Sequence, residues 1–152
     1  MHRVPIRLLM LFAMLLLLLG GMSCQAGKRF YPVRGQVFID GKPAEGVTIV
    51  FHLEDDPDQP PTQPTAIVQA DGSFELRSYL VKERELKNGA PPGPYRVTCV
   101  WYPADLNKYL GQENLPDKLK GKYADPKTTT LRAEVAEKPN ELPAFQLELE
   151  EK

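Results

Sequence analysis

Few residues in this 152-residue sequence combine the type and the spacing that catalysis needs. After the N-terminal segment, His52 is the only histidine, which excludes a metal site built from several histidines. His52 alternates with Phe51 and Leu53, so the pattern predicts a partly exposed histidine on a strand. Nucleophile-elbow, P-loop and dinucleotide-binding motifs are absent from the sequence. We therefore expect a protein with no catalytic residues, no cofactor and no metal.

Two other groups of residues offer binding chemistry. The acidic residues between Glu54 and Asp58 could supply oxygen ligands to calcium, but Pro57 interrupts the spacing, which favours a solvated proline-rich loop over 54–65. Trp101 and Tyr102 could form a platform for a sugar ring. Neighbouring strand residues face opposite sides, and Trp101 shares its face with core candidates, so core packing is the better interpretation.

The N-terminus has the pattern of a bacterial secretion signal. Arg3 and Arg7 precede the apolar run Leu8–Leu19, which is followed by small residues up to Ser23. A membrane-spanning helix needs roughly 20 apolar residues, so this run is short for a permanent span. We expect residues 1–23 to be a signal peptide of the lipoprotein type, forming a signal helix, and residues 24–29 to be a polar tether.

Cys24 lies where a bacterial lipoprotein signal carries its lipidated cysteine. Ser23 fits the small residue required before that cysteine, whereas Gly21 stands where the pattern prefers an aliphatic residue. The alternative is ordinary cleavage near Ala26 and release of a soluble protein. Lipidation of Cys24 is the favoured interpretation, because Ser23 and the position of the cysteine after the apolar run both fit the pattern. Several acyl chains would then give stable membrane anchoring. Gln25 after the cysteine resembles the sorting signal for the outer membrane of the cell envelope.

The second cysteine, Cys99, lies within the apolar segment 95–102, where a buried, unpaired thiol is expected. Removal of residues 1–23 takes two of the 19 basic side chains and none of the 20 acidic ones, which leaves a formal charge of −3. Nucleic-acid binding needs a basic surface, so nucleic acid is not an expected partner.

Alternating apolar residues and turn signals predict seven strands in one domain over 30–152. The expected strands are 31–39, 46–53, 65–69, 73–77, 95–102, 131–135 and 145–149. Residues 78–89 read as a single helical turn or an irregular loop, and Pro139-Asn140 as a turn. An insertion over 103–127 has room for one short helix within 106–119. These features predict an all-β fold, a seven-stranded antiparallel sandwich.

Several motifs of the chain resemble the carboxypeptidase regulatory-like, or transthyretin-like, domain, which is a Greek-key sandwich. The motifs are Val33-Arg34-Gly35-Gln36-Val37, Asp40-Gly41-Lys42-Pro43-Ala44-Glu45-Gly46-Val47, Asp71-Gly72-Ser73-Phe74 and Pro92-Gly93-Pro94-Tyr95-Arg96-Val97. With the signal and the segment 120–126, the chain is also similar to small lipoproteins of planctomycete bacteria. The resemblance implies an accessory module without activity of its own. The motif residues support turns, close strand approach and a core tyrosine, Tyr95.

Two functions remain open at this point. The first is a non-catalytic, envelope-anchored lipoprotein with a structural or protein-interaction role. The second is a module that binds carbohydrate or polysaccharide of the cell envelope, for which a row of exposed aromatic side chains is needed. The candidates for that row are Tyr79, Tyr102, Tyr109 and Tyr123. The third possibility, an enzyme related to transthyretin, is disfavoured because one histidine cannot supply the several-histidine site of that class.

Overall fold

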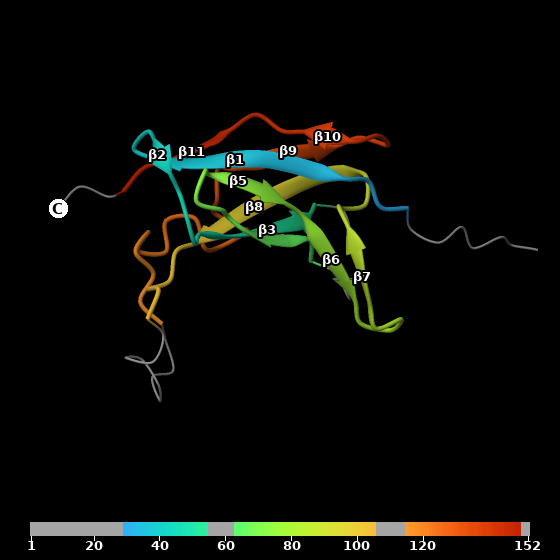
Figure 1. Ribbon diagram of the computed structural model, residues 1–152, viewed down its shortest axis with the longest axis horizontal. Helices are drawn as coiled ribbons and strands as arrows, with labels where there is room; N and C mark the ends of the chain where they lie inside the picture. Colours follow the sequence, from blue (N-terminus) through green and yellow to red (C-terminus); the bar gives the residue numbers. More distant parts are fainter. Residues whose placement is uncertain (1–28, 55–62, 106–114, 150–152) are drawn as a thin grey trace, which may run out of the picture.

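The computed structural model describes residues 29–54, 63–105 and 115–149, and these form an all-β fold (Figure 1). The strands are β1 (Val33–Ile39), β2 (Lys42–Pro43), β3 (Thr48–Leu53), β4 (Thr65–Ile67), β5 (Ser73–Glu75), β6 (Arg77–Leu80), β7 (Glu85–Asn88), β8 (Gly93–Val100), β9 (Arg132–Val135), β10 (Asn140–Glu141) and β11 (Phe145–Leu147). In these ranges there is no helix of the length and hydropathy needed to cross a bilayer. The signal peptide, Cys24 and nearly all of the tether lie outside the described residues.

The strands form two sheets that enclose one core. The larger sheet has the order β7-β6-β4-β3-β8-β9, and every pair in it is antiparallel. The other sheet is built around β1, which pairs with β10 and β11 along one edge and with β5 and β2 along the other. The expectation of an all-β, sandwich-like fold is thus confirmed, with eleven strands in the described ranges instead of seven.

The smaller sheet is mixed, which corrects the expectation of a purely antiparallel sandwich. Val33 of β1 pairs with Asn140 of β10, and Val37 pairs with Phe145 of β11, in both cases in parallel. The turn expected at Pro139-Asn140 lies slightly earlier, at Glu137 and Lys138, because Asn140 already belongs to β10. The side-chain amide of Asn140 closes this turn by donating to the carbonyl oxygen of Ala136 (3.1 Å). Alternation of apolar residues identifies a half-buried strand but carries no information on the direction of its neighbour.

A second correction concerns residues 78–89, which the sequence assigned to a helical turn or a loop. They contribute to a β-hairpin, in which β6 pairs with β7 around a turn that ends at Arg84. Arg84 adopts the left-handed conformation, with φ of 53°, that closes such a turn. Strand β8 likewise ends at Val100, two residues before the expected boundary.

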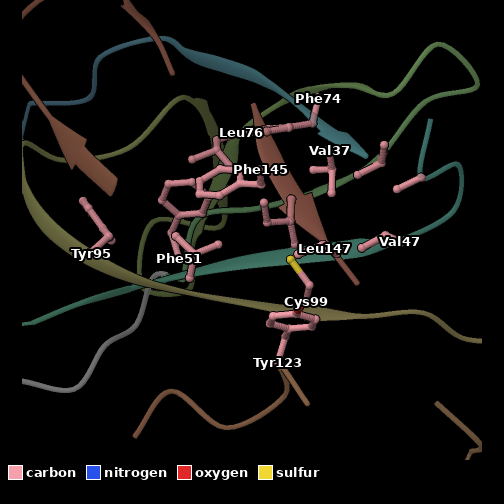
Figure 2. Close-up of a cluster of buried hydrophobic side chains, with 14 of the residues drawn as sticks. Val37, Val47, Phe51, Phe74, Leu76, Tyr95, Cys99, Tyr123, Phe145 and Leu147 are labelled. Atoms are coloured by element: carbon pink, nitrogen blue, oxygen red, sulfur yellow. The ribbon is translucent and has the colours of Figure 1, made fainter. Parts of the chain in front are cut away.

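The core contains a cluster of aromatic rings between the two sheets (Figure 2). The Phe51 ring of β3 lies 5.7 Å from Tyr95 of β8 and 6.3 Å from both Phe74 and Phe145 of the opposite sheet, measured between ring centroids. The buried hydroxyl of Tyr95 donates to the carbonyl oxygen of Pro91 (2.8 Å), which confirms its expected role as a core anchor with a polar partner.

Two of the glycine motifs have the expected physical basis. At Gly35 of β1, a Cβ atom would lie 2.8 Å from the Phe74 ring, so the glycine makes room for this ring to pack over the strand. Asp40 and Gly41 both have positive φ, 48° and 77°, as a two-residue hairpin turn between β1 and β2 requires.

Residues 115–127, which form most of the described part of the insertion, pack against the core. Leu119 and Tyr123 are buried, and the backbone N–H of Cys99 donates to the carbonyl oxygen of Tyr123 (3.0 Å). The Asp117 carboxylate accepts backbone hydrogen bonds from Trp101, Leu119 and Gly121, each at 2.9 Å. Residues 115–119 are not helical, and the rest of the segment where a helix was expected lies outside the described residues.

Candidate interaction surface

His52 is a partly buried strand histidine, as the sequence indicated. Its Nε2 lies 2.9 Å from Oγ1 of Thr98, and its Nδ1 lies 3.5 Å from the amide nitrogen of Gln63. Burial lowers the pKa of His52 below its usual value, so the ring is neutral at pH 7. A hydroxyl next to a neutral imidazole has the geometry of a nucleophile and its base, but Thr98 is only 4% exposed. A substrate cannot approach that hydroxyl, and the pair therefore supports the sheet.

Glu54, the one described member of the acidic run, takes part in an ion-pair network. Its Oε1 lies 3.3 Å from Nε of Arg96 and 3.2 Å from Nε of Arg132, which ties together the ends of β3, β8 and β9. The other acidic residues of the run lie outside the described residues. Within the described ranges there is no group of three or more His, Cys, Asp or Glu side chains placed to hold a metal ion.

The structure does not bring the described aromatic candidates into one row. Trp101 packs partly buried against the edge of the core, and Nζ of Lys118 lies 4.3 Å from its ring centroid. Tyr123 is buried, whereas Tyr79 and Tyr102 are exposed on separate elements. Tyr109 lies outside the described residues.

Cys99 is a free, buried thiol, as the sequence predicted. Burial, with a smaller contribution from the negative charge of Asp117, raises its pKa to about 12. A thiol with this pKa stays protonated at pH 7 and is a poor nucleophile. Figure 2 shows its sulfur inside the core, near Leu147 and Tyr123. The residue therefore packs as a small apolar side chain.

The surface that the sequence did not reveal lies on the β6–β7 hairpin. Tyr79 of β6 lies directly opposite Leu86 of β7, and Val81 follows in the turn. These three side chains are 51%, 53% and 58% exposed. We call them the hairpin patch. The signal that could have found it is the pair of short alternating segments Ser78-Tyr79-Leu80 and Glu85-Leu86-Lys87 on either side of a turn.

Tyr79 and Leu86 lie on the outer face of their sheet, which points away from the core, although apolar strand residues normally face the core. In β3 the apolar residues Ile49 and Phe51 face the core, and the register from β3 through β4 to β6 places Tyr79 and Leu86 on the opposite, outer face. The inner face of the hairpin carries Glu85 and Lys87 together with the buried Ser78 and the half-buried Leu80. At this end of the six-stranded sheet, large apolar side chains thus lie on the outer face as well as on the inner one. Exposed apolar residues grouped on one face are typical of a surface that binds a partner.

A groove of about 540 Å³ opens between β4 and β5, where the two sheets separate. The groove forms because neighbouring segments of the chain join different sheets: β4 pairs with β3, whereas β5, which follows the turn at Gly72, pairs with β1. The chain returns to the larger sheet at β6, where Arg77 pairs with Thr65. Its lining residues are Thr65, Ala66, Ile67, Gln69, Ser73, Phe74, Glu75 and Arg77. Arg77 separates the groove from the hairpin patch.

Comparisons with known proteins give no match for this chain: no protein-family model fits the sequence, and no curated protein is similar to it.

Proposed function

We propose that this chain is a non-catalytic lipoprotein module of the carboxypeptidase regulatory-like type, held in the cell envelope by a lipid on Cys24, which binds a protein partner through the hairpin patch. The observation that carries the proposal is the position of Tyr79 and Leu86 side by side on the outer face of the β6–β7 hairpin, where both are exposed. Tyrosine is enriched at the centres of protein interfaces, because its ring buries a large apolar area while its hydroxyl stays hydrogen-bonded.

The surroundings of the patch favour a protein over a nucleic acid or a small substrate. Arg77 shares the outer face with the apolar side chains, and the exposed turn residues Lys82, Glu83 and Arg84 flank them with both signs of charge, as in the polar rim of a protein interface. The groups with catalytic potential are buried or bonded: Thr98 and Cys99 are inaccessible, and His52 is bonded to Thr98. These features support an interaction role without chemistry.

The test compares cross-linked partners of the full-length protein in cell envelopes. We expect one or more specific partners with wild type, their loss with the double variant Tyr79→Ser/Leu86→Ser, and their retention with the matched control Tyr102→Ser. Cys24→Ala should move the protein from the membrane to the soluble fraction while leaving its fold unchanged. Retention of the same partners by the double variant would refute the assignment of the patch.

A carbohydrate-binding module is the second candidate. It is favoured by the position of Tyr79 next to Arg77, which lines the groove, and is weakened because no further exposed ring accompanies Tyr79 among the described residues of that hairpin. A glycan array decides between the two. A glycan bound by wild type and lost in Tyr79→Ser would assign the face to sugar binding, and an array without binding favours the protein partner.

A further inference from the structure

Strand β7 is an edge of the six-stranded sheet, and its backbone is available for pairing. The N–H of Gly89 donates to the carbonyl oxygen of Leu76 (2.7 Å), which fixes the alternation of the ladder. Residues 85 and 87 therefore bond to β6, while the backbone groups of Leu86 and Asn88 point outward from the sheet. Further along the edge, Ala90 exchanges two backbone hydrogen bonds with Tyr31, at 2.9 and 3.0 Å. Within the described residues the open part of this edge is thus short.

The hairpin that carries β7 is also accessible. Figure 1 shows β6 and β7 extending beyond the other strands of the sandwich, with the turn between them at the far end. The free side of β7 at Leu86 belongs to this projecting part, at a distance of four residues from the position that Tyr31 covers. Exposed edges of this kind are the usual sites at which a sheet is extended by another chain.

The sequence Glu85-Leu86-Lys87 is complementary to itself in one antiparallel register. With Leu86 opposite Leu86 of a second copy, Glu85 of each copy lies across from Lys87 of the other. The outward backbone groups of the two Leu86 residues then form a hydrogen-bonded pair, which fits the ladder alternation. A shift by two residues instead places Glu85 opposite Glu85, or Lys87 opposite Lys87. Like charges directly opposite one another disfavour those registers.

The same register joins the apolar faces of the two copies. Residues directly opposite in an antiparallel pair share a face, so both Leu86 side chains lie on the outer face, next to the Tyr79 side chains that each Leu86 already faces within its own hairpin. Glu85 and Lys87 lie on the inner face, where they form an ion pair within one chain. The two hairpin patches thus become one continuous surface across a two-fold axis.

We propose that two copies of this chain associate through antiparallel pairing of β7 with β7, centred on Leu86, to form a symmetric dimer with a continuous sheet. This inference rests on the proposed function, because it identifies the protein partner that binds beside Leu86 as a second copy of the same chain. A closed two-fold interface of this kind uses the same residues on both sides and leaves the β7 edges covered.

Charge reversal tests the pairing in the full-length protein, purified in detergent and measured by analytical ultracentrifugation over a range of concentrations. Glu85→Lys and Lys87→Glu each convert two attractive cross-strand pairs into repulsive ones, so each should weaken the dimer by about tenfold or more. The double variant E85K/K87E exchanges the charges and should restore dimerisation. Glu134→Lys on β9, at the opposite edge of the sheet, is the matched control and should leave the dimer unchanged.

Disulfide trapping gives a second measurement. Leu86→Cys places two cysteines opposite each other at the two-fold axis, and mild oxidation should link the copies at this position. A protein that is monomeric at every concentration, or whose dimer is insensitive to both single reversals, would overturn the self-pairing. The proposed function is tested separately. If the protein is monomeric but Tyr79→Ser/Leu86→Ser still loses the cross-linked partners, the self-pairing is refuted and the binding of another protein by the hairpin patch is supported.

Discussion

Phe51 and Leu86 belong to the same six-stranded sheet but occupy opposite environments. Phe51 lies on β3, under the smaller sheet, and is fully buried among three other aromatic rings. Leu86 lies on β7, in the projecting hairpin, and faces outward. The comparison shows that a strand residue is buried only where a second layer covers its face, whatever its own hydrophobicity. The core specifies the fold, and the hairpin offers a surface to other molecules.

Alanine substitution at the two positions should give the largest contrast. Phe51→Ala leaves a cavity in the aromatic cluster and should lower the free energy of unfolding by about 3–5 kcal/mol. Leu86→Ala removes an exposed side chain and should change it by no more than about 0.5 kcal/mol. Urea unfolding of both variants measures the difference. A large loss of stability in Leu86→Ala would mean that the hairpin contributes to the core after all.

The junction between the two regions should be the next most sensitive place. Gly89 has φ of 91°, and a Cβ atom there would overlap the carbonyl group of Tyr31. Gly89→Ala should cost about 3–4 kcal/mol, because the left-handed conformation costs roughly 1–2 kcal/mol and the two hydrogen bonds between Tyr31 and Ala90 are worth about 1 kcal/mol each.

Gly41→Ala is the matched control for that prediction. Gly41 also has a positive φ, 77°, but a Cβ atom there would meet nothing within 4 Å. We expect only the conformational cost of about 1–2 kcal/mol. Equal losses of unfolding free energy in the two variants would show that the contact with Tyr31 does not hold the hairpin in place.

Cys99 provides a smaller effect than Gly89 and adds a pH dependence. Cys99→Ser buries a hydroxyl in place of a thiol and should cost about 1–3 kcal/mol at pH 7. The pKa of the thiol rises from 9.0 to about 12 on folding, so the folded state keeps a proton that the unfolded state loses between these values. This contribution to stability is complete below pH 9 and is lost as the pH rises toward 12.

The stability difference between wild type and Cys99→Ser should therefore narrow above pH 9, since serine does not titrate there. Urea unfolding at pH 7, 9 and 10 measures it. Rapid alkylation of Cys99 in the native protein at pH 8, at the rate of a thiol introduced at Leu86, would contradict its assignment to the core.

Local sequence patterns predicted those parts of the molecule that local physics determines. Strands β1, β3 and β8 follow from alternation, the Asp40-Gly41 turn from its need for positive φ, and the burial of Cys99 from its position in an apolar strand. The parallel pairing of β10 and β11 could not be predicted in this way, because strand direction is set by contacts between distant segments.

The hairpin patch escaped prediction for a different reason. Its strands are only four residues long and carry charged residues, so their alternation was too weak to distinguish from a loop. Even a correct strand assignment would have placed Tyr79 and Leu86 in the core, because alternation identifies the apolar face and not what covers it. The candidate site is visible only once the second sheet is in position.

The parallel pairing of β1 with β10 and β11 has a consequence for how the chain acquires its structure. Asn140 bonds to Pro32 across 108 positions, so β1 finds its two parallel neighbours only when the last strands have been synthesised. Contacts between such distant segments carry a large loop-closure cost and make folding slow. Until Phe145–Leu147 arrives, one side of β1 is an open strand edge, and the chain remains in a state that proteases and other unfolded chains can reach.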